Sequence, residues 1–183
     1  MESKIITIGG NGVNCVEVGK NKPLIFIGGP CAIESEKHTL YMAEKISKIC
    51  SDLGIKWIFK SCYDKDCRSS KDSFHGVGIL KGLDILSKVR DEFKIPVVSD
   101  FSDATWADKT ANVCDLIQIP AYLCRQTSIL KAAALTKKPI HLKKGQFMSP
   151  WNMKNSVRKL ENFGCEKVIL TDRGTFFGYN QLV

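Results

Sequence analysis

The chain has 183 residues, of which 44% are hydrophobic and 25% are charged, and its formal net charge is +8. These values are typical of one globular domain, and no apolar run reaches the roughly 18–20 residues that span a membrane. The positive charge is spread out, without a long Lys/Arg run or interleaved aromatic residues, which argues against a nucleic-acid binder. We therefore predict neither a membrane nor a nucleic-acid partner.

The first residues, Met1–Ile6, lack the apolar stretch of a secretory signal. The eight cysteines show no C-x-x-C spacing, so we expect reduced thiols, most of them buried, in a cytoplasmic protein.

The chain begins with a segment, Met1–Val18, that we predict to form a short β-hairpin. Apolar, β-branched runs then recur and end on Gly, Ser, Lys or Asp, which predicts strands buried on both faces of a parallel sheet. There are about six of them: Pro23–Ile27, Ile55–Phe59, Ile95–Val98, Asp115–Ile119, Pro139–Leu142 and Lys167–Leu170.

Helical patterns lie between these strands. Ser35 is an expected N-cap of a helix that Gly54 ends, with one face formed by Leu40, Ala43, Ile46, Ile49, Cys50 and Leu53. A second apolar stripe runs from Ile79 to Phe93 and must end before Pro96. Ser149 and Pro150 predict the start of a third helix, through Met153, Val157 and Leu160, that Gly164 closes.

Strands that alternate with helices indicate βαβ units, which fit a doubly wound sheet or a barrel. The segment after the first strand, Gly28–Ser35, is not the G-x-G-x-x-G of a dinucleotide-binding fold. We therefore predict an α/β fold of the (β/α)8 TIM-barrel class, incomplete with about six βα units, in a single partial domain over 1–183.

Polar residues gather where the predicted strands end, and in a (β/α) barrel these ends form one mouth. Cations follow at least three successive strands, and such a cluster is costly unless anions bind between its members. A charged residue after one strand is usually a solvated loop residue, but the repetition predicts a site for one or two phosphorylated small molecules. The residues that end or follow the strands include Cys31, Glu34, Lys60, Lys65, Arg68, Asp100, Gln118, Arg125, Lys143, Lys144, Asp172 and Arg173.

Several motifs in order resemble the 3-deoxy-D-manno-octulosonate 8-phosphate synthases along essentially the whole chain. They are Gly28–Ser35, Phe59–Ser61, Tyr63–Lys65, Arg68–Ser70, Gln118–Thr127, Lys143–Phe147 and Asp172–Gly174. The resemblance implies an aldol-type condensation of phosphoenolpyruvate with D-arabinose 5-phosphate that releases phosphate and serves lipopolysaccharide biosynthesis. It also implies a homotetramer of barrels.

The resemblance assigns roles residue by residue. It implies that phosphoenolpyruvate is held by Lys60, Lys65, Lys144 and Arg173, and the sugar phosphate by Arg68 and Ser69, with Ser70 beside them. It places Gln118, Ala121 and Tyr122 in the wall beside phosphoenolpyruvate, Asp100 near the sugar, and Arg125 in a neighbouring subunit's site.

Cys31 stands where the metal-dependent branch of the family has a cysteine ligand. The resemblance therefore implies a divalent metal (Zn, Fe or Mn), with the remaining ligands expected beyond Val183, and no organic cofactor. A thiolate suits Zn or Fe. On the pattern of this residue alone a small buried side chain is the better interpretation of Cys31, and the surrounding motif reverses that preference.

The sequence also departs from the family. Cys67, His75 and Ser102 stand where the family has Asn, Arg and His, and the chain ends in Gly178–Val183 within a stretch that the family continues. Because a closed barrel needs eight strands, we expect a C-terminally truncated chain that is inactive and poorly soluble alone.

Two alternative functions remain open. One is 3-deoxy-D-arabino-heptulosonate 7-phosphate synthase, whose sugar loop normally differs from Asp66–Ser70. The other is an inactive fragment or a remnant that binds sugar phosphate.

Overall fold

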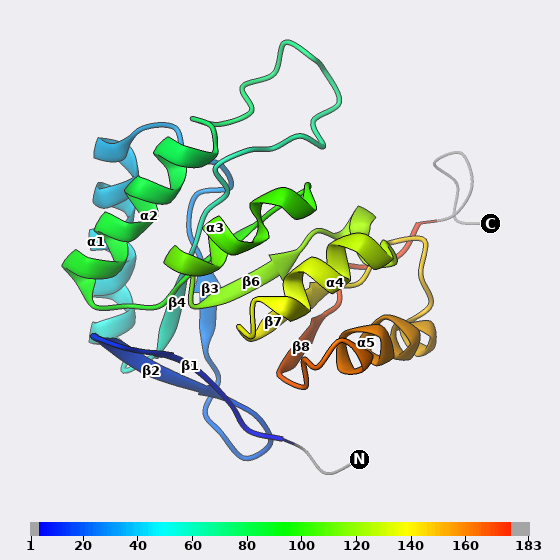
Figure 1. Cartoon of the computed structure of the whole chain (residues 1–183). Helices are drawn as coiled ribbons and strands as arrows, with labels where there is room; N and C mark the ends of the chain where they lie inside the picture. Colours follow the sequence, from blue (N-terminus) through cyan, green and yellow to red (C-terminus); the bar gives the residue numbers. More distant parts are fainter. Residues whose placement is uncertain (1–3, 177–183) are drawn as a thin grey trace. The chain divides into compact units, whose positions relative to one another are not determined.

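The computed structural model describes residues 4–176 of the chain (Figure 1). These residues belong to two compact units. Unit 1 comprises Met1–Ser99 with Asn112–Leu116, and unit 2 comprises Asp100–Ala111 with Ile117–Val183.

Unit 1 opens with an antiparallel hairpin of β1 (Ile6–Gly10) and β2 (Val13–Val18). Its two-residue loop is Asn11-Gly12, and both residues have positive φ angles, 51° and 92°. An Asn-Gly pair adopts these angles at low cost, and the resulting twist matches that of the flanking strands. The predicted hairpin is therefore confirmed over its described part, while residues 1–3 lie outside the described residues.

The rest of unit 1 alternates strands with helices. The elements are β3 (Phe26–Gly28), α1 (Glu36–Asp52), β4 (Trp57–Lys60), α2 (Ile79–Phe93) and most of β5 (Val97–Asp100). β3 pairs with β4 and β4 with β5, both in parallel. The β-branched and aromatic residues that suggested strands are buried here: Ile58, Phe59, Val97 and Val98 are fully inaccessible to solvent.

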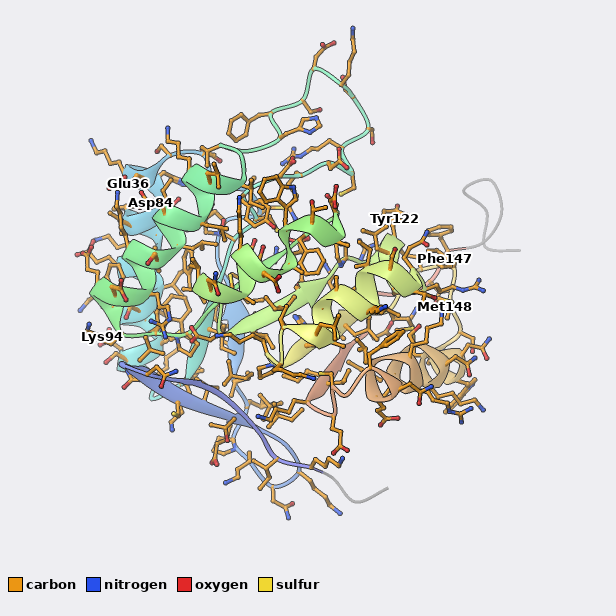
Figure 2. The ribbon with its side chains drawn as sticks, in the orientation of Figure 1. Glu36, Asp84, Lys94, Tyr122, Phe147 and Met148 are labelled. Carbon is orange, nitrogen blue, oxygen red and sulfur yellow. The ribbon has the colours of Figure 1, made fainter. Side chains whose placement is uncertain are left out.

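Helices α1 and α2 pack on each other. The Ser35 side chain accepts a hydrogen bond from the His38 N–H and caps α1, as predicted. Lys88 of α2 bridges the two helices, because its Nζ lies 3.0 Å from Oε2 of Glu36 in α1. The same Nζ lies 2.9 Å from Oδ2 of Asp84, one turn earlier in α2; Figure 2 labels both carboxylate residues.

The predicted buried face of α1 is partly wrong. Ile49 and Leu53 are 58% and 66% exposed, whereas Thr39 is fully buried and donates its hydroxyl to the Ser35 carbonyl. A helical stripe is wider than the surface that its neighbours cover, so periodicity identifies the stripe but not which edge of it is packed.

A buried ion pair joins α2 to the segment before β6. Arg90 contacts the Asp115 carboxylate through Nε, 3.0 Å from Oδ2, and Nη2, 3.1 Å from Oδ1. Oδ2 of Asp115 also accepts a hydrogen bond from the Val97 N–H, so a side-chain oxygen takes the place of a backbone carbonyl as the acceptor at the start of β5. Because Asp115 is only 6% exposed, losing Arg90 would leave a buried charge unpaired, which typically costs about 3–5 kcal/mol.

Unit 2 continues the alternation with shorter helices. Its elements are η1 (Ala104–Trp106), most of α3 (Ala107–Val113), most of β6 (Leu116–Ile119), η2 (Ala121–Leu123), α4 (Thr127–Leu135), β7 (Ile140–Lys143), η3 (Pro150–Asn152), α5 (Met153–Asn162) and β8 (Val168–Thr171). β6 pairs with β7 and β7 with β8, again in parallel.

The helix predicted to start at Ser149-Pro150 is confirmed, with one difference. Its first turn is the 3₁₀-helix η3, and the Ser149 side chain makes no capping hydrogen bond.

The strands of the large sheet follow chain order, β3-β4-β5-β6-β7-β8. Parallel neighbours connected by helices in this order are the pattern of a (β/α) barrel, because each right-handed crossover places the next strand beside the last. The predicted fold class, an incomplete barrel of about six βα units with an N-terminal hairpin, is confirmed. Among residues 4–176, no helix is long and apolar enough to cross a membrane.

Candidate active site

In unit 1, the chain after β3 runs against the chain after β4. The Ile33 N–H donates to the Cys62 carbonyl at 2.9 Å, and Ser61 Oγ donates to the Pro30 carbonyl at 2.8 Å. Gly29 permits this approach: it has φ +153°, and a Cβ there would lie 2.3 Å from the Lys60 carbonyl oxygen. Gly29 is thus required by the close packing of two strand ends.

Lys60, the last residue of β4, is half-buried at this edge. Its Nζ lies 2.8 Å from Sγ of the buried Cys62. Cys31, which follows β3, is exposed. Cys31 and Lys60 therefore lie at the C-terminal ends of two neighbouring parallel strands, β3 and β4.

The remaining predicted residues of unit 1 lie on one long loop, Ser61 to Gly78, between β4 and α2 (Figure 1). Its base is closed by hydrogen bonds from Lys65 N to the His75 carbonyl, 2.7 Å, and from Gly78 N to the Tyr63 carbonyl, 3.1 Å. Arg68, Ser69 and Ser70 are exposed at the outer part of the loop. No hydrogen bond or ion pair occupies the Arg68 guanidinium within the part of the chain that the structure describes, so this cation is available to an anion.

Two departures from the family pattern fall on the same loop. Cys67 is exposed next to Arg68. His75 Nδ1 lies 3.8 Å from Asp64 Oδ1 and pairs with it only when the imidazole is protonated.

In unit 2, five predicted residues lie at or after the ends of β5 and β6. Asp100 ends β5 and is half-buried. Gln118 of β6 is 2% exposed, and its Nε2 has no hydrogen-bond partner among the described residues. Ala121 is buried, whereas Tyr122 and Arg125 are exposed on and after η2. A buried amide donor without a partner is costly, so Gln118 has a donor available to a bound group.

Lys144 follows β7 and is held by backbone oxygens. It is 3% exposed, and its Nζ lies 2.6 Å from the Gly174 carbonyl oxygen, 3.2 Å from that of Met148 and 3.3 Å from that of Gly145. The Asp172 carboxylate, on an exposed side chain, is a fourth contact at 3.3 Å. The ammonium thus connects the segment after β7 with the segment after β8, and Arg173 lies exposed in the second of these.

The contact with Lys144 changes the pKa of the Asp172 carboxyl. Its pKa is lowered from the usual value, first because Lys144 donates a hydrogen bond to it, with further help from the Gly174 N–H. The Asp172 carboxylate therefore stays charged to a lower pH than an ordinary aspartate does.

Two aromatic side chains of unit 2, Tyr122 and Phe147, lie near the segment after β7 (Figure 2). Figure 2 labels Tyr122, Phe147 and Met148 there. A Cβ on Gly145 would lie 2.8 Å from the Phe147 ring and 2.9 Å from the Ala121 carbonyl oxygen, so Gly145 allows these two residues to pack closely against the backbone after β7. Unit 2 therefore brings η2, the segment after β7 and the segment after β8 together.

The described residues do not supply a complete metal site. Cys31 offers one thiolate, and no group of three or more His, Cys, Asp or Glu residues within 4–176 is arranged to hold an ion. A catalytic metal normally takes about three protein ligands. The further ligands that we predict lie beyond Val183 and outside the described residues.

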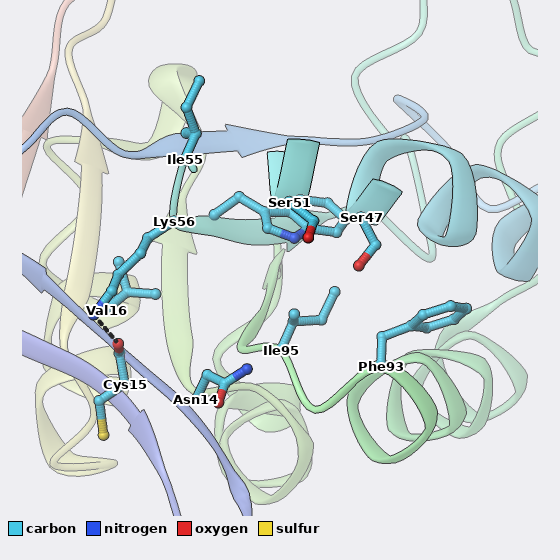
Figure 3. Close-up of a pocket in the computed structure, with 10 residues that line it drawn as sticks. Asn14, Cys15, Val16, Ser47, Ser51, Ile55, Lys56, Phe93 and Ile95 are labelled. Carbon is cyan, nitrogen blue, oxygen red and sulfur yellow. Dashed lines mark hydrogen bonds between the residues drawn. The ribbon is translucent and has the colours of Figure 1, made fainter. Parts of the chain in front are cut away.

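A sizeable cavity lies elsewhere in unit 1. It has a volume of about 490 Å³ and is lined by β2, α1 and the residues that precede β4 and β5, including Cys15, Lys56, Phe93 and Ile95 (Figure 3). These residues are at the N-terminal ends of the strands, so this cavity is not at the edge where the predicted site residues lie. Substrate sites of (β/α) barrels occur at the opposite, C-terminal ends.

The sequence reasoning did not assign roles to two charged residues of unit 2. Lys143 is the last residue of β7 and pairs in register with Thr171 of β8, so it offers a second ammonium at the strand end. Asp172 contacts Lys144. Both residues stand next to residues with assigned roles in the sequence. The signal that distinguishes Lys143 from Lys144 is the alternation of side chains between the two faces of β7.

The family assignment comes from comparison with known proteins. A sequence model described as the DAHP synthetase I family matches residues 6–183. The chain belongs to this family. Curated proteins similar to this chain are named 2-dehydro-3-deoxyphosphooctonate aldolase, a synonym for the synthases whose motifs the sequence resembles. Three of them come from Rickettsia peacockii (strain Rustic), 51% identical over 93% of this chain, Rickettsia canadensis (strain McKiel), 51% over 92%, and Desulfotalea psychrophila (strain LSv54 / DSM 12343), 50% over 91%.

These three proteins are longer than the chain. The matched region spans 62% of the R. peacockii protein, 61% of the R. canadensis protein and 59% of the D. psychrophila protein.

Proposed function

We propose that this chain acts in the condensation of phosphoenolpyruvate with D-arabinose 5-phosphate to give 3-deoxy-D-manno-octulosonate 8-phosphate and inorganic phosphate. The observation that carries the proposal is the identity of about 50% with the aldolases named above, over more than 90% of the chain. The cations that follow the strands of each unit support it, because both substrates are anions.

The proposed reaction forms one carbon–carbon bond. C3 of phosphoenolpyruvate attacks the aldehyde carbon of the sugar, the aldehyde oxygen takes a proton, water adds at C2, and phosphate leaves. Two anions that repel each other must meet, so most of the barrier is removed by positioning and by charge that stabilises the transition state.

Residues of each unit receive roles in this proposal. In unit 1, Lys60 and Lys65 are assigned to phosphoenolpyruvate, and Arg68 with Ser69 and Ser70 to the sugar phosphate. In unit 2, Lys144 and Arg173 are assigned to phosphoenolpyruvate. The other assignments in unit 2 are Asp100 to the sugar, Gln118, Ala121 and Tyr122 to the wall, and Arg125 to a neighbouring subunit's site.

The available groups on Arg68 and Gln118 support two of these roles. The exposed guanidinium of Arg68 has no described partner, and the buried Gln118 Nε2 donor has none either. Both are donors suited to the oxygens of phosphate and carboxylate groups.

Cys31 is proposed as a thiolate ligand of Zn, Fe or Mn. A bound divalent ion would polarise the aldehyde or orient the water. Metal content after dialysis, compared between the wild type and Cys31→Ser, tests this assignment without measuring turnover. Equal content in the two proteins would overturn it. A homotetramer and a cytoplasmic location are further parts of the proposal.

The decisive assay measures phosphate release from phosphoenolpyruvate in the presence of arabinose 5-phosphate, with and without added divalent metal. The R. peacockii protein serves as the positive control. Sugar-dependent release by this chain would support the proposal and would overturn our expectation that the chain is inactive alone. If the control turns over and this chain does not, while calorimetry also detects no phosphoenolpyruvate binding, the proposal is wrong for this chain.

The matched family's own name favours a second candidate, 3-deoxy-D-arabino-heptulosonate 7-phosphate synthase. That enzyme uses erythrose 4-phosphate, so replacing the pentose phosphate with the tetrose phosphate in the same assay distinguishes the two. Faster release with the tetrose phosphate would support the second candidate.

A further inference from the structure

The cavity of unit 1, at the N-terminal ends of the strands, has no role in the proposed reaction. It lies between the first half of β2, the second half of α1, the end of α2 and the residues at the start of β4 and before β5 (Figure 3). Its volume of about 490 Å³ is within the range of sites for small organic molecules. The chemistry of its lining therefore decides what it can bind.

The hairpin that forms one side of the cavity is attached to the rest of unit 1. Asn14 N of β2 donates to the Lys94 carbonyl at 2.8 Å, and Arg90 Nη2 donates to the Gly10 carbonyl at 3.4 Å. Arg90 is itself paired with the buried Asp115 carboxylate. The cavity is therefore a fixed part of unit 1 that exists before any ligand binds.

One part of the lining is apolar. Val16, Trp57 and Ile95 are 2%, 5% and 5% exposed. Phe93 is half-buried and Ile55 is 38% exposed, so both side chains keep apolar surface that a ligand can cover. A ligand with an aromatic body would remove this surface from water, which favours binding.

The polar part of the lining offers hydrogen-bond donors. They are the hydroxyls of Ser47 and Ser51, the Asn14 amide and the Lys56 ammonium, and no carboxylate is present among the described lining residues. Within residues 4–176, no hydrogen bond engages the side chain of Asn14, Ser47 or Ser51. Lys56 Nζ has one hydrogen bond there, to the Cys15 carbonyl, and its length of 3.4 Å exceeds the usual range (Figure 3). One cation with neutral donors around it suits a carboxylate.

The acidic side chain that interacts with Lys56 is already engaged elsewhere. The pKa of the Glu17 carboxyl is lowered, first by a hydrogen bond from Lys22 and only in smaller part by Lys56. Lys22 Nζ lies 2.7 Å from Glu17 Oε2. Lys56 therefore retains a charge that a ligand can pair with.

Helix α1 ends beside the cavity, and a helix C-terminus by itself favours a cation. Two of its last carbonyls already accept backbone hydrogen bonds, Cys50 from Ile55 N at 2.8 Å and Ser51 from Gly54 N at 3.1 Å. Because these oxygens are occupied, the full charge of Lys56 outweighs the partial charge of the helix end.

We propose that this cavity binds a small aromatic monocarboxylate. The carboxylate pairs with the Lys56 ammonium and accepts hydrogen bonds from the neighbouring donors, and the ring covers Phe93 and Ile55. The proposal is independent of the proposed reaction, because the cavity is remote from the strand ends to which the substrates are assigned.

Calorimetry on the full chain tests the site with hydrocinnamate as the probe. Hydrocinnamamide has the same body without the charge, acetate has the charge without the body, and phenethylammonium carries the opposite charge. Hydrocinnamate is expected to bind at least about tenfold more tightly than each of the three. No detectable binding of hydrocinnamate would overturn the proposal, and so would equal or tighter binding of the amide or the ammonium.

Two variants locate the binding. Lys56→Met should weaken hydrocinnamate binding about tenfold to hundredfold and leave hydrocinnamamide binding unchanged. Ser51→Trp, at an exposed position of α1, places a large side chain in the cavity and should abolish binding of both. Lys81→Met, at an exposed position in the first turn of α2, is the matched control and should bind as the wild type does. Thermal unfolding checks that each variant is folded, and wild-type affinity in folded Lys56→Met or Ser51→Trp would reject the site.

Discussion

In unit 1, Arg68 lies on a long loop whose outer part is exposed, and its guanidinium contacts no described side chain. In unit 2, Lys144 is 3% exposed and is surrounded by three carbonyl oxygens and a carboxylate. Both residues are cations that follow a strand of the same kind of sheet. The difference shows that position after a strand does not decide the surroundings of a cation, because the local backbone supplies acceptors to Lys144 and none to Arg68.

The largest expected effect concerns stability. Lys144→Met removes a charged donor from three carbonyl oxygens and should lower the free energy of unfolding by about 3 kcal/mol. Arg68→Met, which removes no contact, should change it by less than about 0.5 kcal/mol. Urea denaturation followed by circular dichroism measures both. If both variants lost the same free energy of unfolding, the described difference in contacts between Lys144 and Arg68 would be wrong.

The next effect concerns the base of the unit 1 loop, which is more tightly packed than its outer part. Gly76 has φ +135°, and a Cβ there would lie 2.2 Å from the Tyr63 carbonyl oxygen, so Gly76→Ala should cost about 2 kcal/mol. Gly78 has φ +81° but open space around the Cβ position, so Gly78→Ala should cost only about 1 kcal/mol. Thermal unfolding of the two variants gives the comparison, and the reverse order would show that the base is not packed as described.

How much of the fold and of the candidate site could be predicted from the sequence differs from residue to residue. The strand positions and the N-cap role of Ser35 could be predicted, because β-branched runs favour strands and a capping hydroxyl binds backbone only a few residues away. Helix α4 was not predicted, because its sequence TSILKAAAL is apolar almost throughout and shows no stripe, and the described helix α3 has only seven residues. The burial of Lys144 was equally invisible, since it depends on carbonyl oxygens of Met148 and Gly174, which the sequence does not place beside it.

A smaller effect is expected in limited proteolysis. Trypsin should cleave after Arg68 or Lys71, both exposed on the long loop, about tenfold faster than after Lys144 or Arg173, whose segments are joined by hydrogen bonds. Mass spectrometry of the first fragments identifies the sites. Initial cleavage after Arg173 would contradict the description of the unit 2 segments as the more rigid.

The smallest effect is a pH dependence at Asp172. The pKa of this carboxyl is lowered by the Lys144 hydrogen bond, so its contribution to stability is complete above the ordinary aspartate pKa, about 3.9, and is lost as the pH falls through the lower folded value. Carbon-detected NMR titration should show Asp172 protonating below the ordinary range. In Lys144→Met, the pKa should return toward the ordinary value, and an unchanged titration would mean that another group lowers it.

The enclosure of the Lys144 ammonium also affects its covalent chemistry. An amine must be accessible and give up a proton before it can attack an acylating reagent, and the Lys144 Nζ directs its protons at the Gly145, Met148 and Gly174 oxygens. Exposed lysines such as Lys154 should be acetylated first, and Lys144 only when the segments around it open. The rate at which that one amine becomes labelled would therefore report the opening of unit 2 in an otherwise native protein.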